Sequence, residues 1–329
     1  MTIIKVRAPV RVDFAGGSLD LWPVGLMVPG AVTVNCAVSL AAKVECSPFD
    51  DEGIRLVSQD LDVDYLWKRG SGPGDLPLME KLCCTFGETR GYTLRTSSDA
   101  PPGSGLGGSS AMALATALAL LGTSGTALPD ERIVAVCRDV EAQLLGIPTG
   151  VQDYWPALMG GLLSIQYEPG GERVEKLDVP LKEVAARMIV AYSGRSRLSS
   201  GTNWALVKRF LDGDRKTVEG LVGIADTARK IVSALVSGDM DLVGRLIGEE
   251  WSFRRNLAPG ISTPRVEALL DCGRRAGALG GKACGAGGGG CVLLWTEPST
   301  RQDVEKALER EGALLLPAHP VEKGAIIEK

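Results

Sequence analysis

The segment PPGSGLGGSSA at residues 101–111 decides how the fold is interpreted, because it sets a glycine-rich loop directly before a helix-forming stretch. Four glycines lie between residues 103 and 108, and residues without a side chain let the backbone approach a ligand closely. Residues 110–121 are apolar on all sides, which predicts a buried helix. The free N–H groups and positive dipole end of that helix point into the loop. The segment therefore predicts an anion site, most simply for phosphate groups.

Nine consecutive residues of this loop are candidates for contact with the phosphates. They are Pro102, Gly103, Ser104, Gly105, Leu106, Gly107, Gly108, Ser109 and Ser110. The two serines stand at the start of the helix and leave two alternatives open. They cap the helix, or a hydroxyl reaches a Mg²⁺ ion that the phosphates hold.

Other interpretations of the loop compete with a phosphate site of this kind. Gly103, Gly105 and Gly108 satisfy the dinucleotide pattern G-x-G-x-x-G, which would indicate an oxidoreductase. That pattern needs an acidic residue after a second strand about 20 residues later, and Leu128-Pro129-Asp130 predicts a helix start there instead. The Walker pattern G-x-x-x-x-G-K-[ST] is absent. A plain glycine turn that caps a helix is the remaining alternative.

The order of predicted elements indicates an α+β fold. Strands are predicted first, at 2–14, 31–46, 92–97 and 161–167, with a hairpin turn at 168–173. Later come a strand at 187–193, helices over about 200–279, a strand at 291–296, a helix at 301–312 and a short last strand at 313–317. A chain of 329 residues is large for one core, so we expect two domains, residues 1–175 and 176–329.

Composition limits the function classes. The net charge of −4 gives no electrostatic footprint for nucleic acid. The longest purely apolar run, residues 111–121, is short of the ~20 residues that a membrane span needs. Eight cysteines form no C-x-x-C pair, so we expect no zinc finger but reduced, mostly buried thiols in a cytoplasmic protein. A Ser-His-Asp hydrolase would depend on the single histidine, His319, which we expect at the surface.

Two carboxylates downstream of the loop are candidate functional groups. Glu141 shares one face of helix 130–145 with the apolar side chains of Val134, Cys137, Leu144 and Leu145. A buried carboxylate needs a metal or another cation, and an arginine salt bridge is an equal alternative. Asp153 precedes Tyr154-Trp155-Pro156, which predicts either a helix N-cap or a general base, and the pattern alone favours the cap.

Two further segments complete a resemblance to a known family. Residues 7–21 read RAPVRVDFAGGSLDL, and residues 282–291 read KACGAGGGGC. With the loop at 101–111, these segments resemble the three motifs of the GHMP kinases (galactokinase, homoserine kinase, mevalonate kinase and phosphomevalonate kinase). Galactokinases carry Glu-His where Gly16, Gly17 and Ser18 stand here. The first motif is more similar to the D-glycero-D-manno-heptose 7-phosphate kinase and fucokinase branch, which phosphorylates the anomeric hydroxyl.

The resemblance implies a fold and a set of roles. The fold would have an N-terminal ribosomal protein S5 domain 2-like domain and a C-terminal ferredoxin-like domain, with the active site between them. ATP and Mg²⁺ would be the cofactors. Glu141, Ser109 and Ser110 would bind Mg²⁺, and Asp153 would be the base. Arg11 would lie beside Asp153, orient it, lower its pKa and steady the transferring phosphoryl group.

The acceptor would be a small sugar or sugar phosphate, with neither nucleic acid nor membrane as a partner and with the chain a monomer or homodimer. Its expected contacts are Gly16, Gly17, Ser18 and Asp20 near the N-terminus, Gly287 and Gly288 in the second glycine loop, and Arg195 and Arg197. The two arginines would hold an acceptor phosphate or are plain surface arginines. A galactokinase-, mevalonate- or homoserine-type kinase and a sugar sensor without catalysis remain alternatives.

Overall fold

The computed structural model describes residues 2–87, 91–194 and 202–329, and within these ranges the chain forms two β-sheets. The larger sheet has the order β12-β1-β2-β5-β3-β4, and β6 and β7 extend it from β2. Its strands are β1 (Ile4–Ala15), β2 (Val32–Pro48), β3 (Ile54–Ser58), β4 (Val63–Trp67), β5 (Tyr92–Ser98), β6 (Leu162–Glu168), β7 (Gly171–Lys176) and β12 (Ile326–Glu328). The smaller sheet has the order β11-β8-β10-β9, formed by β11 (Leu314–Leu315), β8 (Met188–Tyr192), β10 (Cys291–Thr296) and β9 (Ala278–Ala283).

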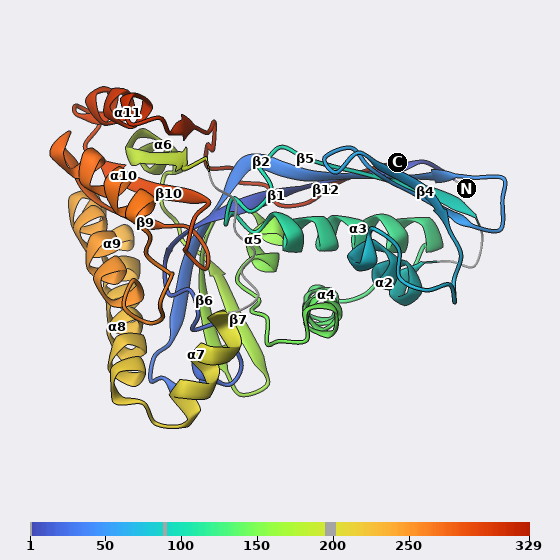
Figure 1. Ribbon diagram of the computed structural model, residues 1–329, viewed down its shortest axis with the longest axis horizontal. Helices are drawn as coiled ribbons and strands as arrows, with labels where there is room; N and C mark the ends of the chain where they lie inside the picture. The colour runs from blue at the N-terminus through green and yellow to red at the C-terminus, as the bar shows by residue number, and fades with distance from the viewer. Residues whose placement is uncertain (1, 88–90, 195–201) are drawn as a thin grey trace.

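The helices fall into an earlier and a later group along the chain, which the colours of Figure 1 distinguish. Those that follow the strands of the larger sheet are α1 (Val24–Met27), α2 (Pro77–Phe86), α3 (Gly108–Ser124), α4 (Asp130–Leu145) and α5 (Tyr154–Met159). Those of the later half are α6 (Leu181–Arg187), α7 (Thr202–Leu211), α8 (Arg215–Ser237), α9 (Met240–Arg254), α10 (Pro264–Arg275) and α11 (Arg301–Arg310). Strands therefore dominate the first half and helices the second, which confirms the predicted α+β class.

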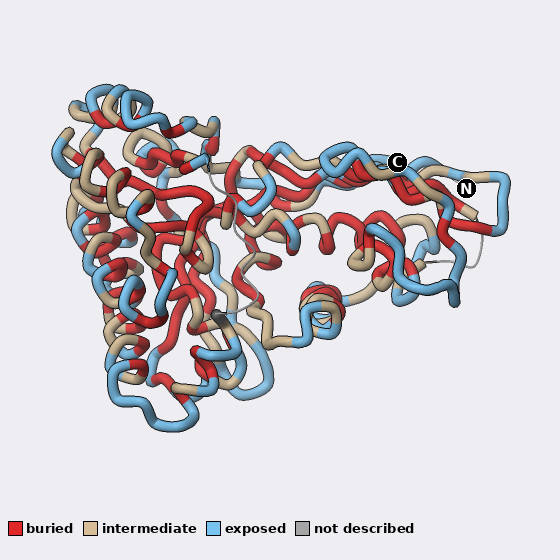
Figure 2. The backbone as a smooth tube through the Cα atoms, viewed as in Figure 1, coloured by how far each residue is buried: buried red, intermediate tan, exposed pale blue. Residues whose placement is uncertain are grey.

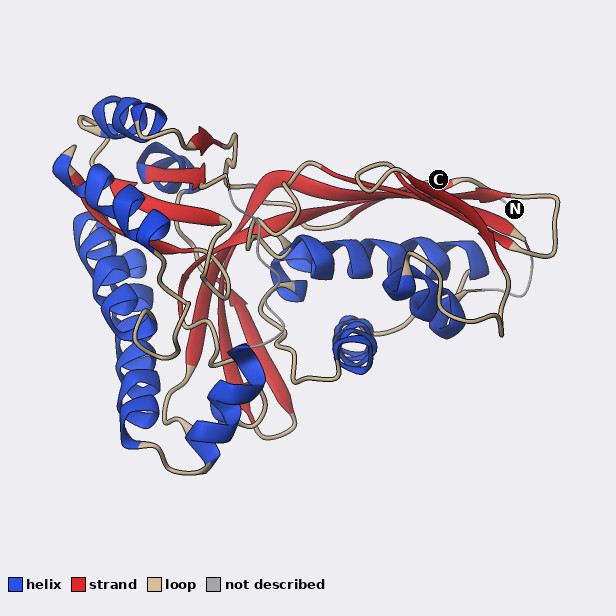
Figure 3. Cartoon of the chain, viewed as in Figure 1, coloured by secondary structure: helices blue, strands red, loops and turns tan. Residues whose placement is uncertain are grey.

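Helix α3 lies along one face of the larger sheet, with α2 and α4 on the same side, whereas α8 packs against β1 and β2 where the sheet bends away (Figure 3). It is apolar all round and is buried from Ala113 to Leu121, as the sequence predicts. Figure 2 shows the buried backbone running along the sheet, α3 and the junction of the two parts. Inside this core the larger sheet contacts the smaller one. Phe14 of β1 meets Trp295 of β10 edge-on, with the ring centroids 5.4 Å apart.

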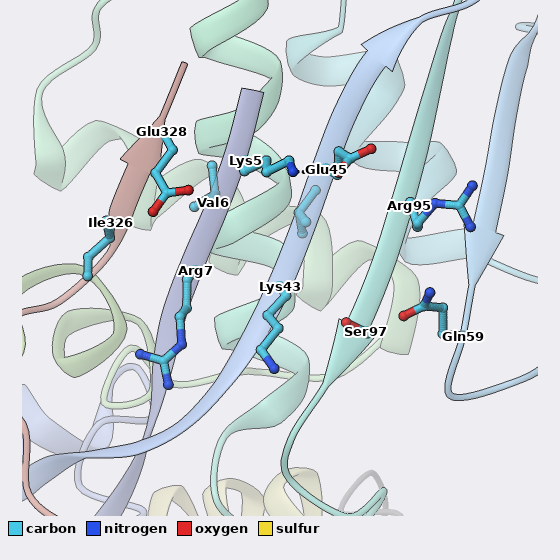
Figure 4. Close-up of a pocket in the computed structure, with 11 residues that line it drawn as sticks. Lys5, Val6, Arg7, Lys43, Glu45, Gln59, Arg95, Ser97, Ile326 and Glu328 are labelled. Atoms are coloured by element: carbon cyan, nitrogen blue, oxygen red, sulfur yellow. Dashed lines mark ion pairs between the residues drawn. The ribbon is translucent and has the colours of Figure 1, made fainter. Parts of the chain in front are cut away.

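Beside the first residues of β1 the opposite face of the larger sheet is polar, because residues of a strand point alternately to its two faces. On β1 the buried Ile4 and Val6 alternate with the exposed Lys5 and Arg7. Figure 4 shows the shallow pocket on this face, of about 340 Å³, with Lys5, Arg7, Lys43 and Arg95 among the residues that line it. This face lies away from the glycine loops.

The segment from Gly16 to Ala31, which includes α1, packs into a second hydrophobic core beside the smaller sheet. Leu19, Leu21 and Val24 pack there with side chains of α7, α8 and the smaller sheet. Asp20 is held in place because Leu19 and Leu21 on either side of it are buried in this core.

Several predicted boundaries are wrong. The helical region ends at Arg275, and β9 begins at Ala278, within the stretch predicted to be helical to 279. Strand β7 begins at Gly171, inside the predicted hairpin turn. The strand predicted as the last one is β11, but β12 follows and pairs with β1. Leu145 is 42% exposed and does not belong to the buried face of α4.

Other predictions agree with the structure. Six of the eight cysteines are buried. His319 is exposed. Among the helices of the described residues, none combines the length and the apolar character that a membrane crossing requires.

Candidate active site

The glycine loop at 101–108 ends at the start of α3 as the sequence predicts. Gly103, Gly105 and Gly107 have φ values of 67°, 76° and 76°, in the left-handed region that favours glycine. Gly107 is the N-cap, and no side chain caps the helix, so the capping alternative for Ser109 and Ser110 is wrong. No neighbour lies within 4 Å of the place that a Cβ at Gly108 would occupy, which leaves the helix start open for a ligand.

The loop is held between β1 and the second glycine loop. Its buried members Ser104 and Leu106 point inward, while Pro102 and Gly103 are exposed. The backbone N–H of Arg11 donates to the carbonyl of Leu106 (2.9 Å), and the N–H of Cys291 donates to that of Ser104 (2.7 Å). The two glycine loops are therefore parts of one site, although about 180 residues separate them in the sequence.

Glu141 faces the start of α3. Its carboxylate accepts hydrogen bonds from Ser109 Oγ (3.2 Å), Ser110 Oγ (3.4 Å) and Tyr154 Oη (2.7 Å). Burial raises the pKa of Glu141, although these three donors act against the rise. In the described ranges no Lys or Arg lies within ion-pair distance of Glu141, so none of the described arginines forms the alternative salt bridge.

This cluster fits a magnesium ion that is shared with phosphates. It offers carboxylate and hydroxyl oxygens, the hard donors that Mg²⁺ prefers. In residues 2–87, 91–194 and 202–329 no three His, Cys, Asp or Glu side chains form a metal cage. Mg²⁺ in phosphoryl-transfer sites usually has one or two protein carboxylates and takes its other ligands from phosphates and water.

Arg11 and Asp153 form an ion pair at the edge of the glycine loop. Arg11 Nε donates to Asp153 Oδ1 (2.8 Å), and its second terminal nitrogen lies 2.5 Å from the same oxygen. The carboxylates of Asp153 and Asp13 raise the pKa of Arg11, although burial alone would lower it. Asp153 occupies the N-cap position of α5, but its side chain makes no capping hydrogen bond, so the cap alternative is wrong.

The pair also touches the phosphate loop. Arg11 Nη1 donates to the carbonyl of Gly105 (2.6 Å). A Cβ at Gly107 would lie 3.1 Å from Asp153 Cβ, so this glycine lets the carboxylate approach the loop. Arg11 is buried, whereas the Asp153 side chain is 24% exposed. The accessible member of the pair is thus the carboxylate.

Asp20 lies near Asp153, because it is hydrogen-bonded to the preceding residue, Gln152. Its carboxylate accepts hydrogen bonds from the backbone N–H and the side-chain amide of Gln152, both at 3.3 Å. Burial, and then the negative charge of Asp153, raise the pKa of Asp20 to about 6. A Cβ at Gly150 would overlap this carboxylate, so the glycine is needed for the close approach.

A chain of buried charges behind Arg11 joins β1 to β9 and α9, and it is not among the features predicted from the sequence. Lys282 Nζ lies 2.6 Å from Asp13 Oδ2 and 3.2 Å from Glu250 Oε1. Glu250 in turn pairs with Arg254 at 2.8 Å. The side chains of all four residues are at most 2% exposed. Asp13 lies in the first motif and Lys282 in the third. A charged residue within a predicted strand was the signal that could have indicated a buried ion pair.

Arg254 connects this chain to the predicted acceptor loop. Its guanidinium donates to the carbonyl of Gly17 (2.6 Å) and lies 3.5 Å from Ser18 Oγ. A Cβ at Gly17 would lie 2.6 Å from the guanidinium, and one at Gly16 would overlap Val32. These glycines therefore seat the loop on the protein itself, in addition to any contact with an acceptor.

The remaining predicted contacts are less informative. Gly288 donates its N–H to the carbonyl of Ile261 (2.7 Å), and a Cβ at Gly287 would meet the same residue, so both pack against the loop before α10. Their contact with an acceptor stays a prediction. Arg195 and Arg197 lie outside the described residues.

Comparison with known proteins agrees with this arrangement. The family models for "GHMP kinases N terminal domain" and "GHMP kinases C terminal" match residues 76–161 and 231–314. The chain is 26% identical over 326 residues to the D-glycero-alpha-D-manno-heptose 7-phosphate kinase of Campylobacter jejuni, with 94% of each chain covered. It is 30% identical over 251 residues to the mevalonate kinase of Thermococcus sibiricus, covering 73% of this chain and 70% of that one.

The fold has close counterparts among solved structures. The crystal structure of a D-glycero-D-manno-heptose 1-phosphate kinase from Bacteroides thetaiotaomicron superimposes with a TM-score of 0.80 over 99% of each chain, at 22% identity. The matched segments contain both glycine loops together with Glu141 and Asp153.

Proposed function

We propose, starting from the premise that this chain belongs to the GHMP kinase family, that it transfers the γ-phosphoryl group of ATP to a hydroxyl group of a sugar or sugar phosphate. Family membership makes the chain an ATP-dependent phosphotransferase with an alcohol group as acceptor. The finer proposal is an acceptor that reacts at its anomeric hydroxyl. It is supported by the first motif and by the similarity to a heptose 7-phosphate kinase along nearly the whole chain.

The observation that carries the proposal is the Arg11–Asp153 pair against the phosphate loop. A general base must lie within hydrogen-bond reach of the acceptor hydroxyl, close to the phosphoryl group. Asp153 is partly exposed and lies beside Gly107 at the start of α3. Arg11 holds one carboxylate oxygen, so the other oxygen is available for a substrate hydroxyl.

The proposed reaction is an in-line displacement. A bond forms between the acceptor oxygen and the γ-phosphorus, the bond from that phosphorus to the ADP leaving oxygen breaks, and the hydroxyl proton passes to Asp153. The backbone N–H groups of the loop and the start of α3 hold the phosphates. The positive charge of Arg11 stabilises the negative charge that develops on the transferring group.

Ser109, Ser110 and Glu141 are the residues that would hold Mg²⁺ together with the phosphates. When bound, the ion supplies neutralisation of the charge on the phosphoryl oxygens. Tyr154 keeps the Glu141 carboxylate oriented toward the two serines through its hydrogen bond of 2.7 Å.

The acceptor side of the site is assigned to Asp20 and the loop from Gly16 to Ser18. An ionised carboxylate accepts hydrogen bonds from sugar hydroxyls. Asp20 is half-buried and is held by Gln152, which directly precedes Asp153. A sugar bound by Asp20 would thus present a hydroxyl to the base.

The variant Asp153→Asn tests the assignment. We expect turnover to fall by about 10²–10⁴ because a general base is lost, while ATP still binds. Turnover is measured as ADP release with a panel of L-fucose, D-galactose, a heptose 7-phosphate and mevalonate, and ATP binding by calorimetry. Asp64→Asn, which breaks a surface pair with Arg55, is the control. Near-normal turnover of Asp153→Asn would contradict the base assignment.

The similarity to mevalonate kinases favours a second candidate, a kinase for a non-sugar alcohol. The identity of 30% to the Thermococcus sibiricus enzyme covers 73% of this chain. The same panel decides, because mevalonate would then give the highest ADP release and the sugars would give little.

A further inference from the structure

A large groove opens beside Asp20. Its volume is about 1240 Å³, and no residue of the glycine loop at 101–108 is among those that line it. The walls come from the loop before α1, the outer side of α4, the β6–β7 hairpin and α7, which surround the same region in Figure 1. Ligand pockets for small molecules measure roughly 300–1,000 Å³, so the groove has room for an acceptor that extends beyond one hydroxyl-bearing carbon.

Two exposed tryptophans line this groove. Trp22 is 73% exposed and Trp204 is 55% exposed, and they come from segments far apart in the sequence. The other four tryptophans are each at most 6% exposed. Both exposed indoles therefore line one groove, and Asp20 lines it as well.

Exposed indoles next to a polar group match the chemistry of a sugar. A sugar ring has an apolar C–H face, which packs on an aromatic ring, and an edge of hydroxyl groups, which bond to a carboxylate. Leu26, which is 44% exposed, adds to the apolar surface on the Trp22 side. An apolar patch rimmed by polar residues marks a binding site rather than ordinary surface.

The charges along the groove discriminate between kinds of sugar. Its acidic members are Asp20, Glu131, Asp139, Glu168 and Glu172. Among the described lining residues Arg138 is the single base, and it pairs with Asp139 at 2.8 Å. Glu168 pairs with Arg173, which does not line the groove. A phosphate dianion would meet mainly like charges here, and like charges at short range repel.

We propose that Trp22 and Trp204 bind an uncharged sugar in this groove, so that the acceptor is a free sugar rather than a sugar phosphate. The inference rests on the proposed function and narrows its acceptor. It also separates this chain from its heptose 7-phosphate kinase relative, whose name specifies a phosphorylated acceptor.

Matched acceptors test the charge argument. ADP release is measured with D-mannose, D-glucose and D-galactose and with their 6-phosphates. We expect kcat/KM for the best free sugar to exceed that for its phosphate by at least about tenfold, from the acidic lining. In Glu168→Lys and Glu172→Lys the preference should shrink, whereas Glu219→Lys, on the exposed side of α8, should leave it unchanged.

The tryptophans are tested separately. Trp22→Ala and Trp204→Ala should each raise KM for the free sugar by about tenfold, the worth of an aromatic contact, and leave kcat within about twofold. Trp22→Phe should restore most of the affinity, and Val236→Ala, an exposed residue of α8, is the control. Because both indoles are exposed, the thermal midpoint should not change. Intrinsic fluorescence should respond to the free sugar, and the double variant Trp22→Phe/Trp204→Phe should lose the response.

The outcomes separate the two proposals. ADP release that is fastest with a 6-phosphate, and that falls in Arg195→Ala/Arg197→Ala, would overturn the inference and leave the sugar kinase intact. Unchanged KM in both tryptophan variants would overturn it as well. Release of ADP with mevalonate alone would refute the sugar acceptor and this inference together, and absence of any fluorescence response to sugars would agree with that result.

Discussion

Lys282→Met should destabilise the protein strongly, because it removes the cation that lies between two buried carboxylates. Lys282 Nζ lies 2.6 Å from Asp13 Oδ2 and 3.2 Å from Glu250 Oε1, and all three side chains are fully buried. Methionine keeps the apolar stem and removes the charge. Glu250 would keep Arg254 at 2.8 Å. Asp13 would keep only the N–H of Gly285 at 2.9 Å and the more distant Arg11 at 3.8 Å.

The magnitude follows from the geometry. At an effective dielectric constant of 20, two unit charges 2.6 Å apart attract by about 6 kcal/mol. Part of this is offset, because the variant no longer removes a lysine ammonium from water. Breaking a buried pair on one side typically costs about 3–5 kcal/mol, a large part of a total stability of about 5–15 kcal/mol. We therefore expect a loss of about 3–5 kcal/mol for Lys282→Met.

Urea unfolding followed by far-ultraviolet circular dichroism measures this loss. Lys230→Met, which removes an exposed cation 3.5 Å from Glu249, is the matched control and should change the free energy of unfolding by less than about 1 kcal/mol. The double variant Asp13→Asn/Lys282→Met should lose less than the sum of its single variants, because the two side chains form one pair. A loss below about 1 kcal/mol for Lys282→Met would refute the reasoning.

The loss of folding stability in Lys282→Met should depend on pH in a direction that the structure defines. Burial would raise the pKa of Asp13, but Lys282, Arg11 and Arg254 outweigh it and hold that pKa below its ordinary value. The stability from Asp13 is therefore present above its unfolded pKa of about 3.9 and is lost as the pH falls through the lower folded pKa. In Lys282→Met the carboxyl can take up a proton instead of remaining charged. The difference in the free energy of unfolding between the unmodified protein and Lys282→Met should thus narrow as the pH falls toward 4, by about 1.4 kcal/mol per pH unit at most.

Three further predictions concern the active site. The pKa of about 6 for Asp20 means that its carboxyl becomes protonated below pH 6, so kcat/KM for the acceptor should fall there, and Asp20→Asn should lose this step in its pH–rate profile. Gly150→Ala should raise the acceptor KM by about tenfold, because its Cβ would displace the Asp20 carboxylate, while Gly72→Ala, with no neighbour within 4 Å, should change nothing. Glu141→Gln should raise the Mg²⁺ concentration for half-maximal ADP release by about 10–100-fold, and Glu219→Gln, on the exposed side of α8, should not.

The sequence predicted those elements that carry their own periodic signal. Strand β1 alternates over its first half, α3 is a continuous apolar run, and Gly146 ends α4 in the left-handed conformation that glycine favours. Strand β12 has no such signal. It is exposed along its length and exists because it pairs with β1, more than 300 residues away in the chain. A strand of this kind is defined by its partner and not by its own pattern.

The predicted parts of the site likewise have a local signal in the sequence, whereas the missed parts depend on partners far away in the chain. A glycine loop before a helix indicates an anion site locally, since the loop and the helix start are neighbours in the sequence. The charged residues behind the loop are different. Glu250 and Arg254 lie one turn apart on α9, where an acid and a base usually form an exposed pair. Their burial depends on Asp13 and Lys282, which no spacing in the sequence brings near them.

This buried chain connects the two sides of the reaction. Asp13 lies on β1 two residues after Arg11, which holds Asp153. At the other end Arg254 holds the carbonyl of Gly17, three residues before Asp20. The base and the acceptor loop are thus fixed to one another through residues of β9 and α9, from the later half of the chain. Packing of that half onto β1 therefore does more than add stability, because without it Arg254 could not set the distance between the acceptor carboxylate and the base.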